Sequence, residues 1–360
     1  MSKAVDKERI FTLQWHITAQ CRNRCRHCYM YDSPTYQAEC DKPLGLDACK
    51  VVIDDFVQLL ESWEVQGRIN LSGGDPLMRP EVFEIIEYAR RQDIQVGILG
   101  NPEFLNVSVA QRLKELGLRS YQLSIDGLEA THDSLRSPGS FKRTVRGLEL
   151  LRDVGIYNIV MFTLSKLNAP ELIPVIRMVN DLKVDVFDFA RVVPVGAGEQ
   201  LKNSLISPEE YHALLLEILD IYRGLKQQGS HTYYGHKDHL WKLLYDEIGV
   251  LGLLPEDQET IFDGCGLGVN LLTVLADGSV MACRRLPVII GKVPEQSLRD
   301  IFIDSEELNQ MRQDTQITKC GSCHLRQFCR GCRAVAYGTS GSYLAADPQC
   351  WRKDDSHLLL

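Results

Sequence analysis

The stretch FTLQWHITAQCRNRCRHCYM, residues 11–30, joins an apolar strand-like run to a loop that carries three cysteines. Their spacing is C-x3-C-x2-C, at Cys21, Cys25 and Cys28. Three thiolates without a fourth suit a four-iron cluster that keeps one iron open to a substrate or cofactor. The arginines between the cysteines favour the thiolate form. A zinc site completed by His27 is the alternative, although zinc sites usually come as complete sets of four ligands.

Strand-like and helix-like segments alternate over the first two thirds of the chain. The segments 80–91 and 107–116, for example, have helical apolar periodicity. This alternation predicts a parallel sheet with right-handed crossovers, either a partial barrel or a doubly wound sheet, with the functional site at the carboxyl ends of the strands. The six strand-like runs are residues 11–18, 68–72, 95–100, 121–126, 158–164 and 185–193.

Length and composition limit the class of protein. The 360 residues fit one large domain and a smaller one, and 44% hydrophobic with 24% charged residues excludes a disordered chain. The sequence contains no apolar run long enough for a membrane span, and a net charge of −8 argues against a nucleic-acid partner. The first ten residues, MSKAVDKERI, lack the features of a secretory signal. We therefore expect a cytoplasmic protein that binds neither membrane nor nucleic acid.

Ten of the twelve cysteines form two groups, which in a reducing compartment indicates metal binding. The second group begins with C-x12-G-x4-C at Cys265 and Cys283, continues as C-x2-C-x5-C-x2-C over residues 320–332, and ends at Cys350. The gap between the groups predicts domains at 1–225 and 263–360, joined by a mainly helical bridge at 226–262. For the two remaining cysteines, Cys40 and Cys49, we expect buried structural roles.

Two further motifs follow predicted strands. In SGGDP, Gly73 and Gly74 allow a close approach of a ligand to the backbone, and Asp75 suits an ammonium group. In LSIDG, Ser124 and Asp126 are two residues apart on one predicted face and suit a ribose. Each motif alone is more often an ordinary turn, but together with the cysteine loop they describe a cluster, an amino group and a ribose at one edge of a sheet.

This combination resembles the radical S-adenosylmethionine (SAM) superfamily over roughly the first 230 residues. The resemblance implies that the first three cysteines hold a [4Fe-4S] cluster whose open iron binds SAM. Reductive cleavage of SAM then yields a 5′-deoxyadenosyl radical that abstracts hydrogen from the substrate. The implied cofactor contacts are Gly73, Gly74 and Asp75 at the amino group, Ser124 and Asp126 at the ribose, Arg136 at the carboxylate, Asn101 at a polar group and His27 beside the adenine. Asp75 stands where the common form has Glu.

The C-terminal cysteines resemble the SPASM extension of radical SAM enzymes, over about residues 263–355. The crossed arrangement of that family assigns Cys320, Cys323, Cys329 and Cys350 to an outer auxiliary cluster, and Cys265, Cys283 and Cys332 to an inner one. The inner cluster is thus one ligand short, and its fourth iron is open, binds substrate, or takes Asp263 or another non-cysteine ligand. The expected fold is α/β, a partial (β/α)6 TIM-like radical SAM barrel followed by a SPASM domain, with three [4Fe-4S] clusters in all.

The leading functional hypothesis is hydrogen abstraction from a residue of a ribosomally made precursor peptide, giving a crosslink, an epimerised centre or a backbone excision. A sulfatase-maturase type of enzyme is disfavoured because Arg284 and Arg285 follow Cys283, where those enzymes have an acidic base. Two more hypotheses are an enzyme of tetrapyrrole or quinone-cofactor biosynthesis and a non-catalytic electron-transfer protein.

The assignments of substrate-binding residues and of partner proteins have the least support from the motifs. Arg191, at the end of the sixth strand, is expected to point toward the radical site, and Tyr233, Tyr234, His236 and His239 to lie in a polar loop near it. About ten residues precede the first strand, too few for a fused leader-binding domain. We therefore expect a separate leader-binding partner, in addition to a flavodoxin- or ferredoxin-type reductant.

Overall fold

The computed structural model describes residues 10–251 and 261–352. Within them, ten strands form one sheet in the order β10-β9-β8-β1-β2-β3-β4-β5-β6-β7. The strands are β1 (Ile10–Thr18), β2 (Gln66–Gly73), β3 (Gln95–Leu99), β4 (Ser120–Ser124), β5 (Tyr157–Leu164), β6 (Val186–Arg191), β7 (Tyr233–Tyr234), β8 (Leu271–Val274), β9 (Ser279–Cys283) and β10 (Leu286–Lys292).

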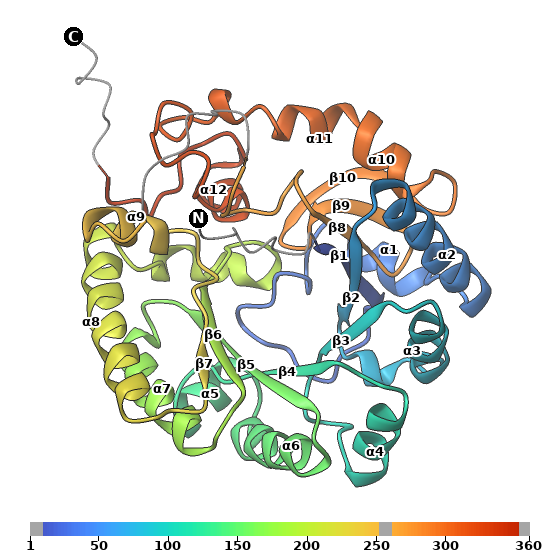
Figure 1. Cartoon of the computed structure of the whole chain (residues 1–360), viewed down its shortest axis with the longest axis horizontal. Helices are drawn as coiled ribbons and strands as arrows, with labels where there is room; N and C mark the ends of the chain where they lie inside the picture. Colours follow the sequence, from blue (N-terminus) through green and yellow to red (C-terminus); the bar gives the residue numbers. More distant parts are fainter. Residues whose placement is uncertain (1–9, 252–260, 353–360) are drawn as a thin grey trace, which may run out of the picture.

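Strands β1 to β6 are parallel and neighbour one another in chain order. The sheet curves around a centre, and the helices that connect its strands pack on its outside (Figure 1). This arrangement confirms the predicted α/β barrel. The helices are α1 (Tyr36–Asp41), α2 (Leu46–Trp63), α3 (Val82–Arg91), α4 (Val107–Glu115), α5 (Glu129–Leu135), α6 (Ser140–Val154), α7 (Leu172–Asp181), α8 (Pro208–Gln227), α9 (Trp241–Glu247), α10 (Leu298–Asp304), α11 (Glu306–Met311) and α12 (Arg333–Ser340).

The sheet extends beyond the six predicted strands at both edges. The two-residue strand β7 pairs with β6 inside the predicted bridge, after α8 and before α9. On the other side β8 pairs in parallel with β1, and β9 and β10 follow antiparallel. The C-terminal segment therefore continues the sheet of the barrel. Residues 252–260 of the predicted bridge lie outside the described part of the chain.

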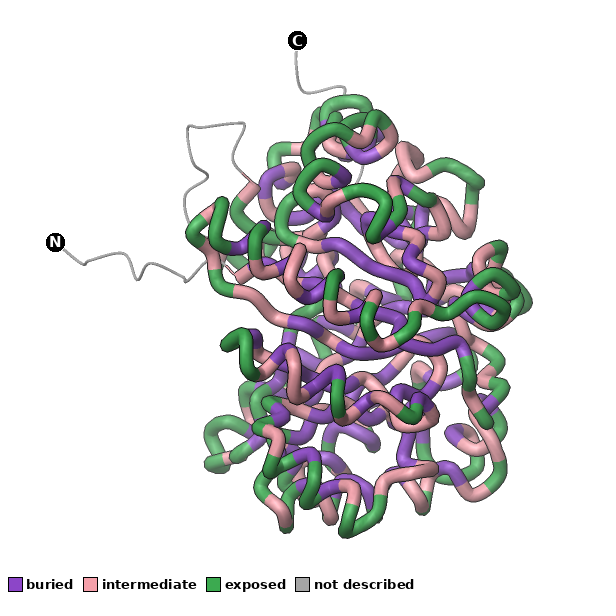
Figure 2. Tube along the Cα trace, turned by 90° about the vertical axis from the view of Figure 1, so that its right-hand side faces the viewer, coloured by how far each residue is buried: buried purple, intermediate pink, exposed green. Residues whose placement is uncertain are grey.

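Apolar side chains between the helices and the sheet fix the strands in place. Helix α3 buries Val82, Ile85, Ile86 and Ala89, the face that its periodicity predicts. Buried residues run through the middle of the molecule along the strands (Figure 2). Because these strands are parallel and packed on a common core, their carboxyl ends meet on one side, where the loops can form a site.

The two cysteines outside the groups differ from each other. Cys49 is completely buried in α2, as predicted, but Cys40 lies exposed in α1, so the expectation of burial was wrong for Cys40. Helix α1 has only six residues and carries Cys40 on its outer side, away from the core. None of the described helices is long and apolar enough to cross a membrane.

Candidate active site

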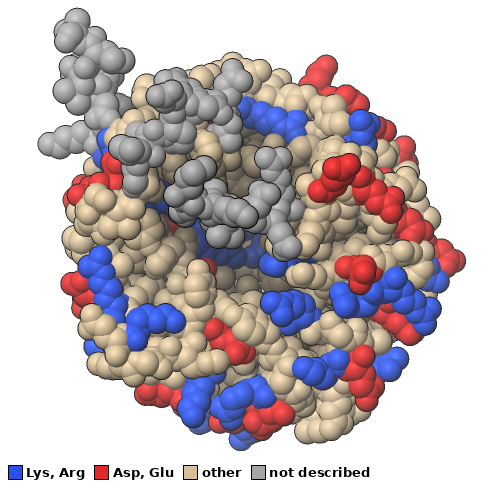
Figure 3. Space-filling view, in the orientation of Figure 1, with Lys and Arg blue, Asp and Glu red and all other residues tan. Residues whose placement is uncertain are grey.

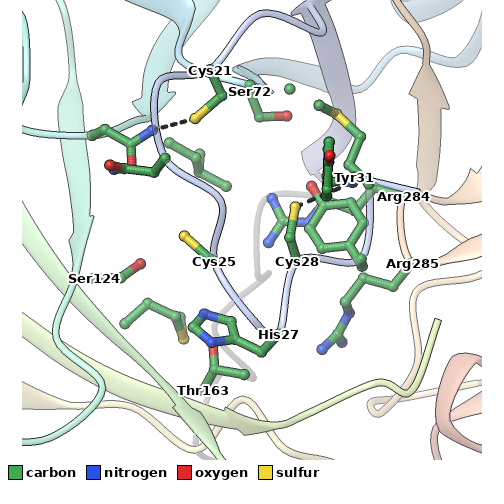
Figure 4. A pocket seen from close by; sticks show the side chains of 18 of the residues that line it. Cys21, Cys25, His27, Cys28, Tyr31, Ser72, Ser124, Thr163, Arg284 and Arg285 are labelled. Carbon is green, nitrogen blue, oxygen red and sulfur yellow. Dashed lines mark hydrogen bonds between the residues drawn. The ribbon is translucent and has the colours of Figure 1, made fainter. Parts of the chain in front are cut away.

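The cysteine loop that follows β1 lies at the carboxyl ends of the strands. The side chains of Cys21, Cys25 and Cys28 point into one space enclosed by the loop and the sheet (Figure 4). Asn101, after β3, donates its side-chain amide to the sulfur of Cys21 at 3.4 Å, and the backbone N–H of Tyr31 donates to the sulfur of Cys28 at 3.3 Å. Hydrogen bonds to sulfur stabilise thiolates, so the loop suits cluster ligands.

Arg136, at the end of α5, brings a positive charge to the thiol of Cys25. Its Nη1 lies 3.9 Å from the sulfur of Cys25. Desolvation raises the pKa of Cys25 to about 12, and the charge of Arg136 opposes that rise. The arginines between the cysteines are exposed instead, and Arg24 stacks over Tyr31 at 4.6 Å. Compensation of the thiolate charge at Cys25 therefore comes mainly from Arg136, which the sequence had suggested only for the SAM carboxylate.

A buried ion pair fixes Arg136. Its Nε donates to Asp126 Oδ2 at 2.5 Å, and the other oxygen of Asp126 accepts the N–H of Thr163 at 2.7 Å. Desolvation raises the pKa of Asp126, but the charge of Arg136 together with His27, His132 and the N–H of Thr163 outweighs it and holds this pKa at about 2. His27 Nε2 lies 3.3 Å from the same carboxylate, and desolvation lowers the pKa of His27 to about 4, so the imidazole is neutral at pH 7.

The expected position of Asp126 beside Ser124 needs correction. Strand β4 ends at Ser124, so the alternation of side chains does not continue to Asp126. Ser124 lines the cavity, whereas the carboxylate of Asp126 is completely buried behind its wall. Asp126 therefore acts on the cavity through Arg136 and His27.

The glycine loop after β2 packs directly on the cysteine loop. The N–H groups of Gly74 and Asp75 donate to backbone carbonyls of the first loop at 2.8 and 2.7 Å. A Cβ atom on Gly73, which has φ +111°, or on Gly74 would collide with carbonyl oxygens of that loop. The two glycines line the cavity, and they are also required for the contact between the loops.

Asp75 is buried behind the glycines with an unsatisfied carboxylate oxygen. Oδ1 accepts the N–H of Leu77 at 3.3 Å, but Oδ2 has no hydrogen-bond partner among the described residues. Desolvation raises the pKa of Asp75 to about 7. An unpartnered buried carboxylate costs stability, and an ammonium group is the kind of partner that would compensate it.

The cavity has a volume of about 180 Å³. Of the predicted site residues, the first three cysteines line it together with His27, Gly73, Gly74, Asn101, Ser124, Arg136 and Arg191. The sequence analysis did not assign Lys237, Arg284 and Arg285 to this cavity, although the pair of arginines directly after Cys283 was visible. Figure 4 shows Arg284 and Arg285 opposite Ser124, and Figure 3 shows Lys and Arg side chains in the hollow at the centre of this face.

The guanidinium group of Arg191 is held by carboxylates from two distant segments. It donates to Asp238 at 2.8 Å and to the two oxygens of Asp347 at 2.7 and 2.9 Å, and it also contacts Gln349 at 2.9 Å. Arg191 is 1% exposed. These contacts join the barrel, the bridge and the C-terminal segment, and they indicate that Arg191 has a positioning role. Contact of Arg191 with substrate stays a prediction.

The residues of the predicted polar loop take separate positions. Tyr233 is exposed, and Tyr234 is buried and stacks on Tyr222 with ring centroids 4.5 Å apart. His236 and His239 line a second cavity rather than the one at the first three cysteines. Their neighbour Lys237 lines both cavities.

The second cavity contains the three cysteines assigned to the inner auxiliary cluster. Cys265, Cys283 and Cys332 line it, and Arg285 interacts electrostatically with all three. Desolvation raises the pKa of Cys265, but the interactions with His239, Arg330 and the backbone of Leu267 together outweigh it and lower this pKa to about 6. Asp263, the non-cysteine ligand suggested by the sequence, pairs with Lys242 at the edge of this cavity.

Each of the four cysteines assigned to the outer cluster interacts electrostatically with at least one of the others. Cys320 and Cys350 interact electrostatically, as do Cys329 with both of these and Cys323 with Cys350. Among the described residues, no group of three or more His, Cys, Asp or Glu side chains is placed to hold a single metal ion. The ligand assignment itself stays a proposal.

Comparisons with known proteins identify the family. Residues 15–179 match the Radical SAM superfamily, and residues 265–324 match an iron–sulfur cluster-binding domain, SPASM. The chain is 30% identical to the AdoMet-dependent heme synthase of Methanosarcina barkeri, over 94% of this chain and 95% of that protein. The chain is a radical SAM/SPASM enzyme.

Two other proteins show how widely this architecture is shared. The radical SAM/SPASM enzyme described here is 25% identical to the mycofactocin maturase MftC of Mycobacterium tuberculosis, over 94% of this chain and 82% of that one. Its fold matches that of Streptococcus suis SuiB bound to S-adenosylmethionine with a TM-score of 0.73 and 15% identity, covering 96% of this chain and 78% of SuiB.

The residues of this radical SAM/SPASM enzyme fit the cofactors of its family. A bound iron–sulfur cluster and SAM would supply one-electron reduction and a carbon radical. The three thiols and Asn101 suit the cluster. Asp75 does not line the cavity, so its contact with the SAM ammonium group stays a prediction that rests on its buried Oδ2. The neutral imidazole of His27 offers a flat surface beside them without a proton to transfer at pH 7.

Proposed function

We propose that this enzyme abstracts hydrogen from a residue of a ribosomally made precursor peptide and thereby forms a crosslink, an epimerised centre or a backbone excision. The positively charged lining of the cavity carries the proposal, because Lys237 and Arg284 reach the space beside the first three cysteines. SuiB, whose fold this chain shares with a TM-score of 0.73, has been solved with its precursor peptide SuiA bound, so this fold can accommodate a peptide.

The charges in the cavity favour a substrate with an anionic group. Lys237 and Arg284 line the cavity, and within the described residues neither makes an ion pair with a carboxylate. Arg284 instead stacks over Tyr29 at 5.7 Å. Lys237 interacts electrostatically with Asp188, so Arg284 is the cation better placed to receive a carboxylate of the substrate, such as an acidic side chain of the peptide.

A tetrapyrrole carboxylate is the second candidate substrate. The 30% identity with a heme synthase over nearly the whole length of both proteins favours it, and the same two cations suit a propionate. A peptide and a tetrapyrrole can both present a carboxylate to these cations. We put the peptide first because SuiB, which has the same fold, binds a precursor peptide.

One experiment separates the two candidates. The anaerobically reconstituted enzyme, reduced and supplied with SAM, is incubated in parallel with a co-expressed precursor peptide and with an iron-bound tetrapyrrole carrying propionates. We expect a mass change in the peptide and none in the tetrapyrrole. Loss of carbon dioxide from the tetrapyrrole with an unchanged peptide would overturn the proposal in favour of the second candidate.

The proposal implies two protein partners. A flavodoxin- or ferredoxin-type reductant supplies the electron. A separate leader-binding protein raises the local concentration of the peptide at the active site. Turnover with unchanged affinity in the absence of any such protein would exclude the second partner. We also propose that the enzyme holds three [4Fe-4S] clusters per chain. Iron and sulfide analysis of the reconstituted enzyme tests this number.

A further inference from the structure

The inner auxiliary site has three cysteines for a cluster with four irons. Cys265, Cys283 and Cys332 line one cavity, and Cys265 and Cys332 interact electrostatically. Cys49 is buried in the core and Cys40 is exposed in α1, and neither lines this cavity. A fourth protein ligand for this cluster must therefore come from another residue type.

Four side chains of this cavity other than cysteine could ligate iron, and three are committed elsewhere. Asp238 accepts hydrogen bonds from Arg191 at 2.8 Å and from the N–H of Leu240 at 3.1 Å. Asp263 pairs with Lys242. His236 shares a hydrogen bond of 2.5 Å with Tyr245 and packs against Trp241, with ring centroids 4.5 Å apart.

The fourth, His239, lines the cavity together with all three cysteines. It is close enough to Cys265 to interact with that thiol electrostatically. It is partly exposed toward the cavity, whereas Asp238 and Leu240 on either side of it are buried. The buried neighbours anchor the backbone, because Asp238 is tied to Arg191, and this anchoring holds the imidazole at the cysteine site.

We propose that His239 is the fourth protein ligand of the inner auxiliary cluster. A ring nitrogen donates its lone pair to the iron that the three thiolates leave open, and no other bond changes. Histidine is an established ligand of iron–sulfur clusters in other proteins, where replacing thiolate by neutral imidazole raises the reduction potential. The proposal is independent of the substrate, so it stands or fails separately from the function proposed above.

The first test detects histidine nitrogen at the cluster. Full-length enzyme is labelled with ¹⁵N-histidine, reconstituted without SAM, reduced and studied by pulsed EPR. We expect a strongly coupled ¹⁵N in the wild type and in the control His236→Ala, which alters a histidine of the same cavity that contacts Tyr245. The coupling should be absent in His239→Ala. Absence of the coupling in the wild type, or its persistence in His239→Ala, overturns the proposal.

A second variant separates ligation from a merely structural contribution. His239→Cys offers a thiolate at the same position, so it should keep the iron and sulfide content of the wild type, lose the ¹⁵N coupling and show a lower reduction potential for one cluster. His239→Ala should lose iron from that cluster or leave it more easily oxidised. If His239→Cys retains the potential of the wild type, or if the wild type assembles no inner cluster, the assignment is wrong.

Discussion

Replacing Arg191 by Leu should destabilise the whole enzyme. Arg191 is 1% exposed and binds the carboxylates of Asp238 and Asp347, which are 6% and 2% exposed. The leucine removes the cation and leaves both carboxylates buried without their principal partner. Breaking a buried pair in this way costs roughly 3–5 kcal/mol. At about 2 °C per kcal/mol, the melting temperature should fall by roughly 6–10 °C.

The assay is thermal unfolding of the protein without SAM, followed by circular dichroism, with Arg91→Leu as a matched control. Arg91 pairs with Glu87 on the surface, where their side chains are 73% and 41% exposed. Such exposed pairs typically contribute less than about 1 kcal/mol, so the control should melt close to the wild type. If Arg191→Leu melts with the control while the KM for substrate rises, Arg191 contacts substrate and the positioning role is refuted.

Three further predictions concern the cofactor and cluster sites. Replacing Cys21, Cys25 and Cys28 together by Ala should abolish reductive cleavage of SAM while two clusters remain, measured as 5′-deoxyadenosine and iron; continued cleavage would contradict the assignment. Asp75→Asn should weaken SAM binding roughly tenfold or more in equilibrium titrations, through loss of a charge-assisted hydrogen bond; an equal loss of iron would mark a structural role. Burial raises the pKa of Asp75 to about 7. The favourable contribution of Asp75 to the free energy of unfolding is therefore present below its usual pKa and is lost as the pH rises through 7. The unliganded Asn variant should accordingly melt above the wild type at pH 8 but not at pH 4. Replacing Cys320, Cys323, Cys329 or Cys350 by Ser should remove the outer cluster and lower the melting temperature, because metal ligation organises that segment; unchanged melting with the cluster missing would argue otherwise.

The barrel could be predicted because its strands are long and their apolar pattern is strong. Strands β1 to β6 lie where the apolar runs are, and the predicted site residues follow most of these strands at the carboxyl end. The Gly73–Gly74 pair and the cysteine spacing are local signals, and the contacts between the two loops are mostly backbone hydrogen bonds. Local patterns of this kind survive in a single sequence.

The contacts that the sequence did not predict depend on long-range packing. Strand β7 has two residues and β8 has four, too short for a periodicity signal, and β8 is defined by its pairing with β1, some 260 residues earlier. Asp126 turns away from the cavity because β4 ends two residues before it and Arg136 captures its carboxylate. Lys237 and Arg284 reach the cavity from the bridge and from the turn after β9, which only the closed fold brings together.

Three consecutive residues of the bridge connect the two cluster sites. Lys237 lines the cavity at the first three cysteines, Asp238 binds Arg191 at the end of β6, and His239 contacts Cys265. Since Arg191 also binds Asp347, whose carboxylate accepts the N–H of Cys332 at 2.8 Å, the same ion-pair network anchors both sides of the inner site. If Cys265, Cys283 and Cys332 hold the inner cluster as proposed, a change of ligand or charge there has a short covalent route, one residue on each side of Asp238, to the position of a cation in the cavity at the first three cysteines.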